Sequence, residues 1–139
     1  METYRHSVHY YETDKMGITH HSNYIRWMEE ARVDWLAKIG WDYARLEEMG
    51  IVSPVMEVNC RYLKSTTFSD VVLVELWVSE LRMAKMKVRY RMKKEDGTIV
   101  AEAESQHAFL SQKGMPLRLQ KEYPELFEAL SQHLVVEES

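Results

Sequence analysis

Cysteine is nearly absent from this sequence, since Cys60 is the only one among 139 residues. A single cysteine excludes a disulfide within the chain and fits a reducing compartment. Proline and glycine are also scarce, at three and five residues, and no proline-rich or low-complexity linker divides the chain. We therefore expect one domain over residues 1–139, a length that suits a single hydrophobic core.

Long apolar runs are missing as well. No stretch approaches the roughly 20 apolar residues that a membrane helix needs, and the start, METYRHSVHYYE, lacks the apolar core of a signal peptide. The formal net charge of −4 argues against a surface attracted as a whole to nucleic acid. We expect a cytoplasmic protein with no membrane span and no nucleic-acid partner.

The longest helical pattern covers residues 22–39. Its apolar residues recur at steps of three and four, which is the period of one helix face. Ser22 or Asn23 is expected to cap this helix, and Gly40 to end it in a left-handed conformation. The apolar stripe consists of Tyr24, Trp27, Met28, Ala31, Trp35, Leu36 and Ile39.

After Gly50 the apolar period changes to two, which is typical of strands. The Asp-Gly pair in EDGT at 95–98 predicts a hairpin turn between the last two strands. Antiparallel strands need one face covered, and the long helix has the apolar stripe to cover it, so we expect an α+β fold with a sheet of about five strands around one central helix. The other expected elements are a strand at 6–11, a short helix capped by Asp42 at 42–49, strands at 55–63, 71–81, 83–94 and 99–112, and a terminal helix at 124–134.

The stretch YYETDKMGITHHSNY at 10–24 crowds an aspartate, a glycine and a histidine just before the long helix. Free N–H groups and the helix dipole make a helix start suited to holding a developing negative charge. Asp14 is expected to lie close to it. The short motif ETDKMG alone favours a simpler role, in which Asp14 forms an Asx turn with Gly17.

The pattern D-x-x-G-x-x-x-H-x-N-Y followed by W-x-E-x-A-R resembles the hotdog-fold acyl-CoA thioesterases. This group contains 4-hydroxybenzoyl-CoA thioesterase and the short-chain thioesterases found with the Tol-Pal system. The element order and the length also match one hotdog domain over nearly the whole chain. The matching residues are Asp14, Gly17, His21, Asn23, Tyr24, Trp27, Glu29 or Glu30, Ala31 and Arg32.

This resemblance implies an enzyme that hydrolyses an acyl-CoA thioester to a free acid and coenzyme A. Asp14 would act as nucleophile or general base, the helix start near His21 would polarise the carbonyl, and the His21 side chain is a second catalytic candidate. Gly17 and Tyr24 are expected to contact the substrate. A thiol has a pKa of only about 8.5, so a thiolate leaves readily and strong acid catalysis is dispensable.

The resemblance also implies a homodimer or a homotetramer with each active site at the dimer interface. It implies no cofactor, because coenzyme A enters as part of the substrate. We also expect no metal, since the adjacent His20 and His21 point in different directions on a helix and no ligand spacing completes a site.

Basic residues line one face of the strand expected at 83–94, where they alternate with apolar ones. Most would pair with Glu102 and Glu104 on the next strand. Arg82 and Lys85 sit where similar enzymes bind the nucleotide of coenzyme A. The same charges would suit an acyl carrier protein, so an acyl-carrier-protein thioesterase is one alternative, and a non-catalytic acyl-thioester binding or scaffold protein is another. The basic residues are Lys85, Lys87, Arg89, Arg91 and Lys93.

Two further features have simple structural interpretations. Glu29 and Glu30 fall on the central helix, where another branch of hotdog thioesterases carries its carboxylate, but ion pairing with Arg26 and Arg32 is the simpler expectation. The thiol in MEVNCRY alternates with apolar residues on one strand face, so we expect a buried core cysteine rather than a nucleophile.

Overall fold

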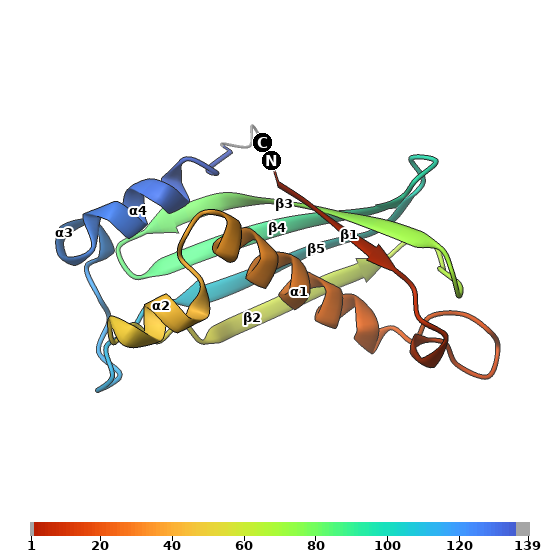
Figure 1. The fold of residues 1–139 in the computed structure, drawn as a ribbon, viewed down its shortest axis with the longest axis horizontal. Coiled ribbons are helices and arrows are strands. Elements are labelled where there is room, and N and C mark those ends of the chain that lie inside the picture. Colours follow the sequence, from red (N-terminus) through yellow and green to blue (C-terminus); the bar gives the residue numbers. More distant parts are fainter. Residues whose placement is uncertain (1, 136–139) are drawn as a thin grey trace.

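The computed structural model describes residues 2–135, which form one antiparallel sheet in the order β1-β3-β4-β5-β2. The long helix α1 lies across one face of the sheet (Figure 1). The predicted α+β fold, with a sheet of five strands around a central helix, is confirmed. The elements are β1 (Glu2–Ser7), η1 (Tyr10–Glu12), α1 (Ser22–Lys38), α2 (Tyr43–Glu48), β2 (Val55–Tyr62), β3 (Val71–Arg82), β4 (Lys85–Lys94), β5 (Ile99–Ala108), α3 (Leu119–Glu122) and α4 (Pro124–Ser131).

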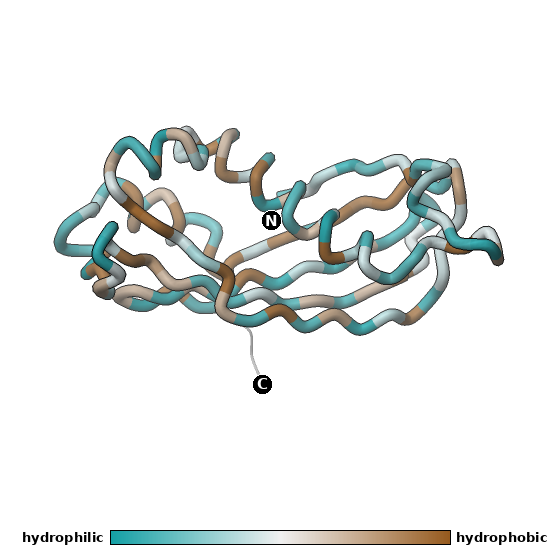
Figure 2. The backbone as a smooth tube through the Cα atoms, turned by 90° about the horizontal axis from the view of Figure 1, so that it is seen from below, coloured by the Kyte–Doolittle hydropathy of each residue, from teal (hydrophilic) through white to brown (hydrophobic). Residues whose placement is uncertain are grey.

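The apolar stripe of α1 packs on the sheet as its period predicts. Along the helix, brown apolar segments alternate with teal polar ones (Figure 2). Trp27 and Trp35 are fully buried against residues of β3 and β4 such as Leu76 and Met92. A side chain of this size buries about 150–250 Å², which is worth roughly 4–6 kcal/mol before chain entropy is counted. No helix within residues 2–135 is long and apolar enough to cross a membrane.

The turns near the helices and hairpins follow their local chemistry. Gly40 follows α1 with a φ of +83°, and the carboxylate of Asp42 caps α2 by accepting a hydrogen bond from the N–H of Arg45 at 2.9 Å. In the hairpin between β4 and β5, Gly97 has a φ of +91° and Asp96 accepts from the N–H of Thr98 at 2.9 Å. Each of these turns depends only on residues that are neighbours in the sequence. The predicted helix end at Gly40, the cap at Asp42 and the hairpin turn at 95–98 are confirmed.

Element boundaries differ where tertiary contacts compete with the pattern. The first strand was expected at 6–11 but covers Glu2–Ser7. The carboxylate of Glu12 accepts a hydrogen bond from the N–H of His9, and this contact bends the chain off the sheet into η1. The last strand ends at Ala108 rather than at 112, the terminal helix ends at Ser131 rather than at 134, and α3 was not predicted.

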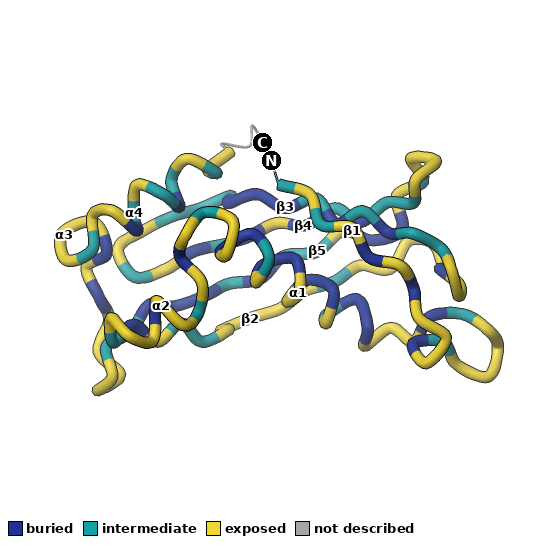
Figure 3. Tube along the Cα trace, viewed as in Figure 1, coloured by how far each residue is buried: buried dark blue, intermediate teal, exposed yellow. Residues whose placement is uncertain are grey.

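Strand β2 forms one edge of the sheet, and its residues are largely exposed, which Figure 3 shows as a mostly yellow segment. Exposed apolar side chains alternate with exposed polar ones along the strand: Met56 is 64% exposed, Val58 39% and Tyr62 45%. A long apolar edge strand is a ready-made template for pairing with another chain.

Candidate active site

The loop between η1 and α1 carries the aspartate, glycine and histidine motif and closes on itself like a small hairpin. Thr13 and Thr19 form an antiparallel bridge, and the N–H of Asp14 donates to the carbonyl of Ile18 at 2.8 Å. Gly17 turns the chain with a φ of +80°, and its N–H donates to the carbonyl of Asp14 at 3.0 Å. A residue with a side chain would be strained in that conformation, so a glycine serves the turn itself.

The carboxylate of Asp14 is exposed on this loop. Its Oδ1 accepts a hydrogen bond from the N–H of Met16 at 2.8 Å, which is the Asx turn that the short motif predicts. Its Oδ2 accepts no hydrogen bond from the residues that the structure describes. One oxygen therefore anchors the carboxylate, and the other is available to a substrate or a water molecule.

Helix α1 begins without the side-chain cap that the sequence predicts. The N-cap residue is His21, whose side chain makes no capping hydrogen bond. Ser22 bonds instead to Nδ1 of His20, through its hydroxyl at 2.8 Å and its N–H at 3.3 Å. The Nδ2 of Asn23 donates to the carbonyls of Glu12 and His20. The cap prediction is wrong because the preceding loop folds back against the helix and takes these side chains as partners.

One backbone donor at this helix start is unused. The N–H groups of His20 and Asn23 donate to the carbonyls of Glu12 and His20, at 2.9 and 3.0 Å. Between them, the N–H of His21 donates to no group within residues 2–135. An unpaired N–H at an exposed helix start carries the positive end of the helix dipole, so it can bind an anion.

The imidazole of His21 is held by stacking. Its ring lies 4.4 Å from that of His20 and 5.9 Å from that of Tyr62, centroid to centroid. Its ring nitrogens bond to none of the described residues. The geometry therefore gives the backbone of His21 a clearer chemical role than its side chain.

Tyr24, expected to contact the substrate, is only 3% exposed. Its hydroxyl shares a hydrogen bond with that of Thr66 at 3.1 Å, and the Thr66 hydroxyl donates to Thr19 at 2.6 Å. Burial raises the pKa of Tyr24, so its phenol stays protonated. Through Thr66, the phenol thus joins α1 to Thr19 on the loop that carries Asp14. A contact between Tyr24 and the substrate stays a prediction.

Arg82 and Lys85 lie far from Asp14 within the same chain. The loop follows β1, whose last residue Ser7 pairs with Val71 at the start of β3, whereas Arg82 ends that strand (Figure 1). Strand β3 has 12 residues, which at about 3.3 Å per residue puts Arg82 roughly 35 Å from Val71. Arg82 also forms an ion pair with Glu80.

The basic residues of β4 are largely paired, but most of them not with Glu102 and Glu104 as predicted. Arg89 pairs with Glu104 at 3.2 Å, as predicted. Lys87 and Lys93 pair instead with β3, at 3.4 Å from Glu80 and 3.3 Å from Glu75. A hollow of about 360 Å³ opens on this face, away from α1, and its lining includes Arg61, Trp77, Arg91 and Glu102.

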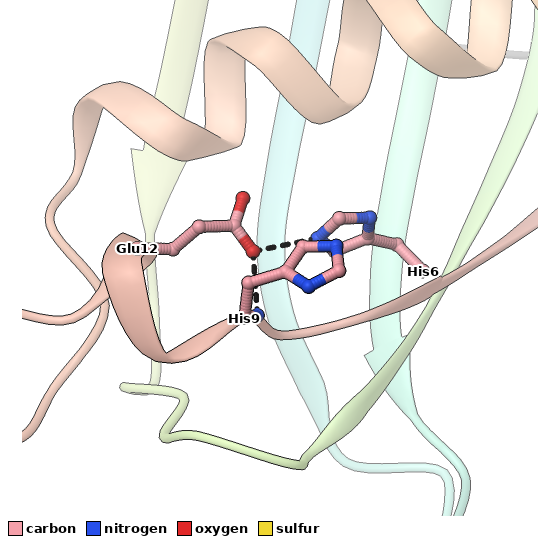
Figure 4. A group of neighbouring side chains, drawn as sticks. All are labelled: His6, His9 and Glu12. Atoms are coloured by element: carbon pink, nitrogen blue, oxygen red, sulfur yellow. Dashed lines mark hydrogen bonds and ion pairs between the residues drawn. The ribbon is translucent and has the colours of Figure 1, made fainter.

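A buried carboxylate, Glu12, is the feature that the sequence analysis missed. With His6 and His9 it brings three potential metal-ligand atoms within 4.8 Å of one another (Figure 4). Its carboxylate already accepts three hydrogen bonds, from His6, His9 and Trp27, and these stabilise it without an ion. The regular spacing of His6, His9 and Glu12, three residues apart in the sequence, is the pattern from which this group could have been predicted. The expectation of no metal stays a prediction.

The ion pairs expected on α1, of Glu29 and Glu30 with Arg26 and Arg32, do not form among the described residues. Arg32 is buried and donates to the phenol oxygens of Tyr43 and Tyr90 rather than to a carboxylate of its own helix. Glu30 reaches across to β1, where it accepts from the hydroxyl of Tyr4 at 3.2 Å and lies 3.4 Å from Nδ1 of His6. The apolar stripe that buries α1 also buries Arg32, so its partners come from the surrounding core.

Cys60 is only partly buried, which corrects the expectation of a core thiol. The reason is that β2 lies at the edge of the sheet, where residues on both faces of the strand remain accessible to solvent. Burial still raises the pKa of the Cys60 thiol, which disfavours the thiolate form that a nucleophile needs.

Known proteins resemble this chain in fold and in sequence. The family model described as the thioesterase-like superfamily matches residues 8–131. A Bacillus subtilis protein provisionally named acyl-CoA thioesterase YneP is 30% identical over 85% of this chain and 86% of its own length. The 1,4-dihydroxy-2-naphthoyl-CoA hydrolase of Thermosynechococcus vestitus is 30% identical over 79% of this chain and 76% of its own. The DHNA-CoA thioesterase structure from Staphylococcus aureus superposes with a TM-score of 0.87 and 32% identity, covering 94% of this chain and 89% of that one.

Proposed function

Because the chain belongs to the thioesterase-like superfamily and is a thioester hydrolase, we propose that it hydrolyses an acyl-CoA to a free acid and coenzyme A with Asp14 as the catalytic carboxylate. The observation that carries this proposal is that two groups on the loop between η1 and α1 make no hydrogen bond with the residues that the structure describes. These are the Oδ2 atom of Asp14 and the backbone N–H of His21.

The two groups suit the two needs of thioester hydrolysis. As nucleophile, Asp14 would bond to the carbonyl carbon, the C–S bond would break, and water would then hydrolyse the acyl-aspartate anhydride. As general base, it would take a proton from the water that attacks the carbonyl. In both routes the thiolate leaves and takes up a proton, and the carbonyl oxygen becomes negative in between. The N–H of His21 and the dipole of α1 would stabilise that charge.

Thiol release from short aliphatic, long aliphatic and aromatic acyl-CoAs tests this function. We expect turnover of at least one class. A pair of variants tests the role of the N–H: His21→Pro removes it, and the φ of −56° at this position already suits proline. His21→Ala removes only the ring.

We expect His21→Pro to lose about a hundredfold to a thousandfold in kcat, and His21→Ala to keep most of it. Equal losses in the two variants contradict a role for the N–H. Circular dichroism and gel filtration check that each variant is folded.

A homodimer through β2 completes the proposal. Two copies of this edge strand, paired antiparallel, would join two sheets and cover Met56 and Val58, which are 64% and 39% exposed. Pairing would also bring the partner close to Tyr62, whose ring packs on His21. Arg82 and Lys85 lie at the far end of the sheet, so they could serve the Asp14 loop only from another subunit. A tetramer, like a cytoplasmic location, stays a prediction.

The alternative acyl donor is an acyl carrier protein, because Lys85 is exposed with no ion pair among the described residues. The acidic surface of a carrier would be attracted to it. Under this alternative, Lys85→Glu together with Lys87→Glu lowers turnover of carrier-linked substrate far more than turnover of acyl-CoA. Similar losses with both substrates refute it.

A further inference from the structure

Glu12 is a buried carboxylate two residues before Asp14, and it is 4% exposed. Its Oε1 accepts hydrogen bonds from the backbone N–H of His9 and from Nε2 of His6, both at 2.8 Å (Figure 4). Its Oε2 accepts one from the indole N–H of Trp27 at 2.7 Å. One side chain thereby joins β1, the turn η1 and the second turn of α1.

The backbone of the same residue holds the other end of the loop. The carbonyl of Glu12 accepts from the N–H of His20 at 2.9 Å and from Nδ2 of Asn23 at 3.0 Å. The adjacent pair Thr13 and Thr19 forms the first bridge of the hairpin. The loop that carries Asp14 is therefore clamped at its entry and exit through one residue, and the clamp is attached to the helix that presents the N–H of His21.

The network fits an ionised carboxylate. Burial alone would raise the pKa of Glu12, but the hydrogen bonds from His9, His6 and Trp27 outweigh burial and lower it. All three donors point at oxygen, and a glutamine would offer only one oxygen. In Glu12→Gln the amide NH2 group must therefore face either the indole N–H or the pair of donors from His6 and His9.

We propose that Glu12 is a positioning residue, which holds the carboxylate of Asp14 in register with the start of α1 and does not itself touch the substrate. This inference rests on the role proposed above for Asp14. When the hydrogen bonds of Glu12 weaken, the carboxylate of Asp14 and the N–H of His21 lose their alignment although both groups remain present. A misplacement of about 1 Å costs on the order of a hundredfold in rate.

The test is the kinetics of Glu12→Gln with an acyl-CoA, with Glu48→Gln as the matched control because that exposed glutamate lies on α2, outside the network. We expect kcat of Glu12→Gln to fall about tenfold to a hundredfold with KM changed less than about threefold. The control keeps both constants. Trp27→Phe, which removes one donor and retains an aromatic ring in the core, gives a smaller loss in kcat and serves if Glu12→Gln does not fold.

A double-mutant cycle separates positioning from a general loss of stability. If Glu12 acts through Asp14, adding Glu12→Gln to Asp14→Asn lowers kcat no further. If the two losses multiply, the positioning role is overturned. Normal kcat in a folded Glu12→Gln, beside an impaired Asp14→Asn, overturns this inference alone. Full activity of Asp14→Asn overturns the proposed catalytic role itself.

Discussion

A buried chain of hydrogen bonds under α1 predicts how stability responds to acid. Arg32 donates to the hydroxyl of Tyr90 at 3.0 Å, that hydroxyl is 2.6 Å from Oγ of Ser105, and Ser105 is 2.7 Å from Nε2 of His107. Because arginine can only donate, the hydroxyl of Tyr90 donates in turn to Ser105, and Ser105 donates to His107. His107 therefore accepts the last hydrogen bond of the series. A protonated His107 would point a donor back against this order.

The energetic consequence follows from the pKa of His107. Burial, with the charge of Arg32 adding to it, lowers that pKa from 6.5 to about 3. Between these values the unfolded chain binds a proton that the folded protein does not, so the free energy of unfolding falls as pH falls from 7 towards 3. For this one group, the loss between about pH 7 and about pH 5 is about 2 kcal/mol.

Urea unfolding at fixed protein concentration measures this effect. His107→Gln keeps a polar side chain that can bond to Ser105 but cannot gain a proton, so its free energy of unfolding lacks this pH dependence. We expect the cost of the substitution to shrink by about 2 kcal/mol from about pH 7 to about pH 5. His20→Gln, at an exposed histidine, is the control. A cost for His107→Gln that does not change with pH refutes the reasoning.

Three other substitutions test separate parts of the account. Val58→Lys places a charge on the apolar edge of β2, and we expect analytical ultracentrifugation to show a smaller species than wild type; an unchanged assembly contradicts pairing through that edge. Asp42→Ala removes the cap of α2 and is expected to cost about 1 kcal/mol in urea unfolding, whereas no loss refutes the cap. Gly17→Ala forces a side chain into a positive φ and is expected to cost about 1–2 kcal/mol, although its Cβ meets no atom within 4 Å; a stable variant contradicts that turn.

Features that depend on neighbouring residues could be predicted from the sequence. The helical stripe, the cap at Asp42, the turns at Gly40 and Gly97 and the hairpin between β4 and β5 are set by local period and turn chemistry, whereas the pairing of β2 with β5 rather than with β3 is not. The fold followed because one apolar helix face had to cover one sheet face.

Features that depend on contacts across the chain could not be predicted in the same way. The role of Glu12 depends on three hydrogen-bond donors from separate elements, which only the folded chain brings to its buried carboxylate. The place of β2 at the sheet edge left Cys60 half-buried, although its period of two suggested a core thiol. The position of Arg82 depends on the strand pairing, which sets it at the opposite end of the sheet from the loop.

The most direct measurement is the kcat of Asp14→Asn on the acyl-CoA that the wild-type protein cleaves fastest. Asparagine can still accept the hydrogen bond from the N–H of Met16, so the loop should keep its shape while the carboxylate is lost. We predict a loss of about a hundredfold or more in a folded variant. Turnover equal to that of the wild-type protein would contradict the account and leave Asp14 as a turn residue.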